Sequence, residues 1–164
     1  MSAREFRTAA LGAIPGKKKK RPAKPRPLPA SIADITDLPA GSRVVVPFPP
    51  VELSPNWRGH WKEKSNATAN YRRTCWALAL EAKLAVPDYA ADGRKIVVQI
   101  DFFPPNRASR DDDNVPSSFK AGRDGIADAL KTDDSRFRTI PILRTEPRSC
   151  VVFTLIDNAE GELA

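Results

Sequence analysis

Hydrophobic and polar positions repeat with two different periods along the chain, and each period predicts a type of element. KIVVQIDFF, residues 95–103, alternates with period two. This alternation predicts a strand with four large apolar side chains on one face and Gln99 and Asp101 on the other. In NATANYRRTCWALALEAKLAV, residues 66–86, apolar residues recur three and four positions apart, which predicts a helix.

Shorter apolar runs predict three more strands, in RVVVPF (43–48), RTIPILRT (138–145) and SCVVFTLI (149–156). Two prolines follow the first run, so VELSPNWRGHWKEKSN is predicted to be an irregular connection. A second helix is predicted to begin near Pro116 and to continue through FKAGRDGIADAL, residues 119–130. Strands and helices interleave without long regular alternation. We therefore expect a small single α+β domain with a mixed β-sheet and two main helices.

The distribution of charge separates a basic tail from this predicted domain. The net charge is +7, yet residues 1–30 alone hold nine basic residues and one acidic residue, so the remainder is close to neutral. The sequence predicts a Pro/Lys-rich disordered tail at 1–30, a linker at 31–42, the folded domain at 43–157 and a C-terminal tail at 158–164. The basic tail is either an arm that binds phosphates non-specifically or a solubilising leader.

Several classes of protein are disfavoured by composition. No apolar run approaches the roughly 20 residues that span a bilayer, and the first residues lack the pattern of a secretory signal. Cys75 and Cys150 fit no metal-ligand spacing and are too few for a disulfide framework. We expect two reduced structural thiols in a cytoplasmic protein.

The segment SRDDDNVPSSFK contains three consecutive aspartates, which repel one another unless a cation is close. In an extended segment Asp111 and Asp113 point to one side and Asp112 to the other. Two carboxylates on one side suit a hard divalent cation, Mg²⁺ or Mn²⁺ rather than zinc. The alternative is a solvated turn whose negative charge favours the N-terminus of the following helix.

Further charged residues after this segment strengthen the metal interpretation. Lys120 and Asp124 are spaced i, i+4 on the predicted second helix, and Asp128 continues that row toward solvent. The pair Asp133 and Asp134 lies in a turn after the helix, which can return it to the first aspartates. Carboxylates with a lysine facing the same space are typical of a metal and phosphate site. The alternatives are a surface ion pair and an ordinary turn.

The order RDDDN, FKAGRD and ALKTDDSRF, preceded by PFPPVELSPNWRGHW, resembles the RusA family of Holliday-junction resolvases over about residues 43–157. The resemblance implies a dimeric, Mg²⁺-dependent endonuclease (Mn²⁺ is also possible) that cuts paired strands of a four-way DNA junction. It assigns Asp111, Asp113 and Asp134 as catalytic metal ligands and Lys120 as the active-site lysine. Asn114 completes the motif and orients a ligand or caps the loop, with Asp124 and Asp133 as supporting residues. Lys120 stands six positions after Asn114 here, where the best-known member has a spacing of three.

Under this hypothesis branched DNA is contacted by basic residues of two loops and by the basic tail; the loop residues are Arg58, His60, Lys62, Lys64, Arg107 and Arg110. Trp57 and Trp61 either stack on exposed bases at the branch point or pack against the first helix. Two symmetric cuts favour a C2 homodimer. Two other functions remain open: a non-catalytic basic DNA-binding protein, and a metal nuclease that acts on other branched DNA.

Overall fold

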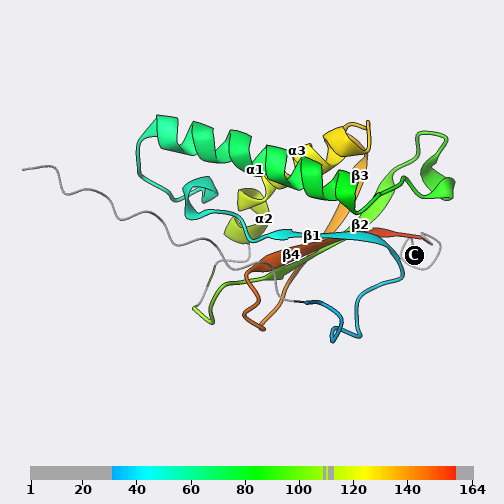
Figure 1. Ribbon diagram of the computed structural model, residues 1–164, viewed down its shortest axis with the longest axis horizontal. Coiled ribbons are helices and arrows are strands. Elements are labelled where there is room, and N and C mark those ends of the chain that lie inside the picture. The colour runs from blue at the N-terminus through cyan, green and yellow to red at the C-terminus, as the bar shows by residue number, and fades with distance from the viewer. Residues whose placement is uncertain (1–30, 109, 111–112, 158–164) are drawn as a thin grey trace, which may run out of the picture.

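Four strands form one mixed sheet, and the two long helices cover one of its faces (Figure 1). The computed structural model describes residues 31–108, 110 and 113–157. The elements are β1 (Gly41–Pro47), η1 (Val51–Leu53), α1 (Trp61–Glu81), η2 (Asp88–Ala90), β2 (Ile96–Phe103), α2 (Asn114–Ser118), α3 (Lys120–Ala129), η3 (Asp134–Arg136), β3 (Phe137–Leu143) and β4 (Cys150–Ile156). The predicted α+β class with a mixed sheet is confirmed.

The order of the strands is β1-β4-β2-β3, with β4 antiparallel to both of its neighbours and β3 parallel to β2. In the register, Ile96 lies opposite Phe137 and Phe102 opposite Leu143. The connection between these parallel strands contains α2 and α3 and crosses the helical face of the sheet (Figure 1). Both acidic motifs therefore belong to one crossover, with Asp113 just before α2 and Asp134 just after α3.

The main core lies between the sheet and the helices. The predicted inward residues of β2, Ile96, Val98, Ile100 and Phe102, are all buried in it. Phe119, which separates α2 from α3, packs edge-on against the rings of Tyr71 and Phe102. The second helix was predicted to be continuous, but the buried Phe119 divides it into two. This junction turns α3 so that it packs along α1.

The first helix begins at Trp61, five residues before the predicted start, within the segment that we expected to be irregular. His60 caps it, because its Nδ1 accepts a hydrogen bond from the backbone N–H of Lys62 at 3.2 Å. The first turns of α1 are solvent-exposed and polar, so hydrophobic spacing gives no signal for them.

The second face of the sheet is covered by residues 31–38, which we call the strap. Its side chains Ile32, Ile35 and Leu38 pack against Phe103 and other buried residues of β2 and β4. The segment 31–42, predicted to be a linker, is thus packed against the sheet and leads directly into β1. Ile32, Ile35 and Leu38 are spaced three apart, but the run covers only seven residues and ends at Pro39, too short for periodicity to assign an element.

Two arginines from the β3–β4 loop hold the strap by ion pairs. Arg148 Nη2 lies 2.6 Å from Asp34 Oδ2, and Arg144 bonds both to Asp37 and to Asp101, the latter at 2.6 Å. Both guanidinium groups lie 5.8 Å from the centre of the Phe103 ring. Asp101 is 0% exposed and also accepts hydrogen bonds from Gln99 Nε2. The polar side of β2 therefore faces a buried ionic network rather than water.

The strap contacts predict a dependence on acidic pH. The hydrogen bonds from Arg148 and Arg144 lower the pKa values of Asp34 and Asp37 below their ordinary 3.8. A carboxylate whose pKa is lower in the folded state than in the unfolded state stabilises the fold. This stabilisation is complete above the unfolded-state pKa and is lost as the pH falls through the folded-state pKa. We expect the Ile35 amide, bonded to the Ile32 carbonyl at 3.0 Å, to lose hydrogen-exchange protection below pH 3.8 before the amides of β2 do. Unchanged Ile35 protection through this range would contradict the expectation.

Gly125 allows α1 and α3 to approach closely. A Cβ atom at this position would lie 2.2 Å from the carbonyl oxygen of Arg72. A Gly→Ala change inside an open helix usually stabilises by about 1 kcal/mol. Here we expect Gly125→Ala to lower the free energy of unfolding by about 1–3 kcal/mol, because the helices must separate. Urea denaturation followed by circular dichroism measures the change, and a stabilised variant would contradict this packing.

Cys75 and Cys150 are buried free thiols, as expected. Burial raises the pKa of Cys75 to about 12 and that of Cys150 to about 11, so both are protonated at neutral pH. Among the described residues, the helices are all too short or too polar to cross a membrane.

Candidate functional site

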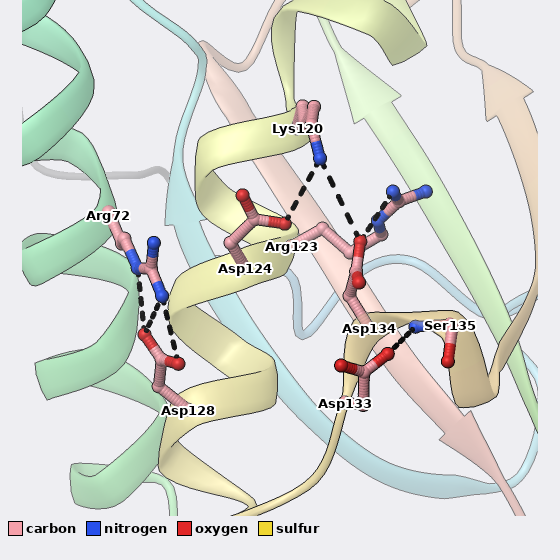
Figure 2. Close-up of polar contacts among 8 residues, drawn as sticks. All are labelled: Arg72, Lys120, Arg123, Asp124, Asp128, Asp133, Asp134 and Ser135. Atoms are coloured by element: carbon pink, nitrogen blue, oxygen red, sulfur yellow. Dashed lines mark hydrogen bonds and ion pairs between the residues drawn. The ribbon is translucent and has the colours of Figure 1, made fainter.

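Four charged side chains of α3 and η3 form an ion network: Lys120, Arg123, Asp124 and Asp134 (Figure 2). Arg72 of α1 and Asp128 of α3 form a separate pair beside it. At the centre of the network Arg123 Nη2 donates to Asp134 Oδ2 at 2.8 Å, and Lys120 Nζ lies 4.0 Å from the same oxygen. Lys120 Nζ also lies 3.7 Å from Asp124 Oδ1, so the predicted i, i+4 pair forms. The chain after α3 thus returns Asp134 to the helix face that carries Lys120.

Asp133 and Asp134 are adjacent in sequence but have different surroundings (Figure 2). Asp133 Oδ1 accepts from the backbone N–H of Ser135 at 2.8 Å and caps η3; the hydrogen bonding at Ser135 lowers the Asp133 pKa. Asp134 instead points toward α3 and its two cations. Of the two carboxylates, Asp134 is the one that faces the candidate site.

Asp128 is solvent-exposed, as expected, and it also binds Arg72 of α1. Arg72 Nε and Nη2 donate to its two carboxylate oxygens at 2.8 and 3.0 Å, and this bonding raises the pKa of Arg72. The pair joins α1 to α3 beside the close contact at Gly125, so Asp128 has a structural partner of its own.

Two adjoining grooves beside β3 lead from Asp113 to the two cations that contact Asp134. The large groove, about 1310 Å³, contains Asp113 and Arg107 in its wall, together with the strap-binding Arg144. The small groove, about 320 Å³, lies between α3 and β3 and is lined by Lys120 and Arg123. The grooves share four lining residues: Phe102, Pro116, Ser117 and Pro141. Asp113 and the two cations beside Asp134 therefore line one continuous surface.

The predicted metal ligands are only partly described. Asp111 lies outside the described residues, Asp113 is exposed in the wall of the large groove, and Asp134 binds Arg123. Carboxylate oxygens are the donor type that Mg²⁺ prefers. Within residues 31–108, 110 and 113–157, no group of three or more His, Cys, Asp or Glu side chains is arranged to hold a metal ion. The carboxylates at Asp113 and Asp134 fit a divalent cation in donor type, and the metal set stays a prediction.

The predicted DNA-contacting residues fall into two groups. Arg58, His60 and Lys62 are exposed, and Lys64 half-buried, at the start of α1. Arg107 is exposed in the large groove, while Arg110 donates three hydrogen bonds to Asn106 and Ala108 and lies over the Phe48 ring at 5.8 Å. Arg110 thus braces its own loop, and Asn114 is the first residue of α2.

Trp57 and Trp61, the two tryptophans considered for stacking on DNA, have different exposures. Trp57 is half-buried, and a Cβ atom at Gly59 would lie 1.9 Å from its ring, so this ring packs within its own loop. Trp61 is 73% exposed beside His60, with ring centres 5.7 Å apart. Trp61 is the aromatic residue available for stacking.

Sequence reasoning did not select Arg123, which lies in the quoted FKAGRD motif and contacts Asp134 more closely than Lys120 does. Its i, i+3 spacing from Lys120 is the signal that identifies it.

Comparisons with known proteins give one clear relative and no function. No protein-family model matches the chain. A protein of Xylella fastidiosa (strain Temecula1 / ATCC 700964), described as an uncharacterized protein, is 40% identical over 114 residues. The alignment covers 68% of this chain and 74% of the relative.

Proposed function

The chain belongs to the same family as the Xylella fastidiosa protein, and we propose that it is a Mg²⁺-dependent endodeoxyribonuclease that resolves four-way DNA junctions. The observation that carries this proposal is the continuous grooved surface lined by Asp113, Lys120 and Arg123, with Asp134 beside the two cations. Carboxylates that can hold a metal, next to cations that can hold phosphate, are what hydrolysis of a phosphodiester requires. The RusA-like order of motifs supports the choice of junction DNA.

Each described residue has a definite part in this mechanism. Asp113 and Asp134, with Asp111, would hold the metal, which supplies a Lewis acid and lowers the pKa of bound water. Lys120 contributes positive charge at the phosphate and is 69% exposed, so it can reach substrate. Arg123 fixes the orientation of the Asp134 carboxylate. The exposed basic side chains at the start of α1 and the predicted basic tail contribute salt-dependent contacts to the DNA backbone.

Symmetric cuts on opposite strands of a junction require two active sites. A C2 homodimer in the cytoplasm is therefore part of the proposal, because a two-fold substrate is matched by a two-fold enzyme. Mn²⁺ is expected to replace Mg²⁺, since both prefer oxygen ligands.

The test compares a labelled four-way junction with a linear duplex of the same sequence. We expect the wild-type protein to make paired, symmetric nicks in the junction with Mg²⁺ and none with chelator. Asp113→Asn is expected to abolish the nicks while junction binding persists. Asp88→Asn makes the same chemical change at an exposed aspartate of η2 and is expected to cleave normally. Binding without cleavage under Mg²⁺ or Mn²⁺ would refute the nuclease.

A non-catalytic DNA-binding protein is the second candidate. It is favoured by one observation: Asp124, Asp128 and Asp134 each already have a basic partner. This candidate predicts junction affinity that is unchanged by Mg²⁺ and by Asp113→Asn. A metal nuclease specific for flaps or other branches predicts cleavage of those substrates in preference to the junction.

A further inference from the structure

Arg123 has more hydrogen-bonding capacity than its contact with Asp134 uses. Its guanidinium carries five N–H donors in a rigid fork. Nη2 donates to Asp134, whereas Nε is buried and has no hydrogen-bond partner among the residues that the structure describes. Buried polar atoms are normally paired, so this nitrogen requires an explanation.

The surroundings of Arg123 favour an anion as a partner for its remaining Nη donors, because Nε itself is buried. Arg123 lines the small groove together with Lys120, and the hydroxyl-bearing residues Ser117 and Thr139 lie in the same walls. The remaining lining residues are apolar. Two cations beside the same groove attract a phosphate more strongly than either does alone.

The neighbouring carboxylates do not exhaust these donors. Asp134 takes one hydrogen bond from Arg123, and Lys120 lies 3.7 and 4.0 Å from its two acidic neighbours, beyond ordinary hydrogen-bond length. Lys120 is exposed and has three donors that can turn toward a ligand. Arg123 can therefore keep Asp134 while it presents further N–H groups to a phosphate oxygen.

We propose that the small groove is a phosphate-binding subsite, in which Arg123 and Lys120 together bind the non-bridging oxygens of a nucleic-acid phosphodiester. The proposal rests on the proposed function for the identity of the substrate, but phosphate binding itself needs neither metal nor cleavage. It makes Arg123 a substrate-binding residue in addition to a positioning residue for Asp134.

The first arm of the test uses inorganic phosphate and metal-free protein with chelator present. The Arg123 Nε–H resonance is identified in ¹H–¹⁵N spectra by its absence from Arg123→Lys. We expect this resonance to shift and saturate as phosphate is added, while an equal ionic strength of sodium chloride leaves it unchanged. The absence of a phosphate-specific shift would overturn the subsite.

The second arm measures junction affinity in chelator with the Asp113→Asn background. Adding Arg123→Ala is expected to weaken binding about tenfold and to reduce the salt dependence by about one phosphate contact. The matched control is Arg138→Ala, which removes the same charge from an exposed residue of β3 whose side chain points to the opposite face from Thr139. It is expected to change affinity less than twofold. Equal effects of the two variants would overturn the proposal.

The two arms, with their controls, distinguish a failure of the phosphate subsite from misfolding of a variant and from a failure of the proposed nuclease function. Arg123→Lys keeps the charge and is expected to restore part of the junction affinity, and thermal melts of all variants verify that they fold. If the wild-type protein does not cleave the junction but both binding arms give the expected results, the nuclease proposal is refuted and the subsite is not. If the junction is cleaved as expected but neither binding arm gives the expected result, the subsite is refuted and the nuclease proposal is not.

Discussion

Asp134→Asn is expected to lower Mg²⁺-dependent junction cleavage by on the order of a hundredfold or more, while the neighbouring Asp133→Asn leaves it nearly unchanged. Asp134 faces Lys120 and Arg123, whereas Asp133 is occupied by the backbone N–H of Ser135. Asparagine keeps the size of the side chain and removes the negative charge that a metal ion requires. Single-turnover cleavage of labelled junction, with enzyme in excess, measures both variants.

Junction binding provides the control for this comparison. Removing the Asp134 charge frees Arg123 and Lys120, so we expect Asp134→Asn to bind junction DNA at least as tightly as the wild type in chelator. Equal loss of cleavage in Asp133→Asn and Asp134→Asn would contradict the assignment, because it would attribute the effect to the shape of the turn rather than to one carboxylate. Retained cleavage in Asp134→Asn would exclude this residue as a metal ligand.

The largest effect on stability is expected for Asp101→Ala, with a loss of about 3–5 kcal/mol in the free energy of unfolding. Asp101 is 0% exposed and bonds Arg144 at 2.6 Å, while the side chain of Arg144 is only 16% exposed. Removing the carboxylate leaves much of a buried guanidinium charge uncompensated, with Asp37 as its remaining partner. Urea denaturation followed by both fluorescence and circular dichroism measures the loss.

Two further variants identify the cause of this loss. Asp92→Ala removes an ion pair of similar length, 2.9 Å to Arg94, but both of its side chains are largely exposed, so a small change is expected. The double variant Asp101→Ala/Arg144→Met removes both buried charges and is expected to cost less than Asp101→Ala alone. An equal or larger loss in the double variant would show that packing of the Arg144 side chain, rather than its charge, explains the effect.

Periodicity predicted the parts of the fold that local patterns determine. The alternation in β2 correctly assigned its inward residues, and it also separated Gln99 and Asp101 onto the opposite face. Alternation states which residues share a face, but not what covers that face. Asp101 is buried because Arg144 and the strap, distant in sequence, come to meet it, and no local pattern contains that information.

In the candidate site, as in the fold, the sequence predicted the contacts that local spacing determines and not those that depend on turn geometry. The i, i+4 spacing correctly predicted that Lys120 and Asp124 approach each other. The choice between Asp133 and Asp134 depended on which carboxylate the Ser135 backbone amide captures, a matter of turn geometry that residue chemistry does not decide. Arg123 was missed because a helix face was assigned from one pair of residues, although the same face includes the residue at i+3.

The strap determines how much of the chain must be kept for the domain to fold intact. A fragment cut at the start of the apolar run RVVVPF, as the sequence boundaries suggest, would lack the three apolar side chains that cover Phe103 and its neighbours. It would also deprive Arg148 of Asp34 and Arg144 of Asp37. Such a fragment would expose an apolar face beside Arg148, whose carboxylate partner is lost, and this surface is prone to self-association. The minimal independent unit therefore begins no later than Ser31.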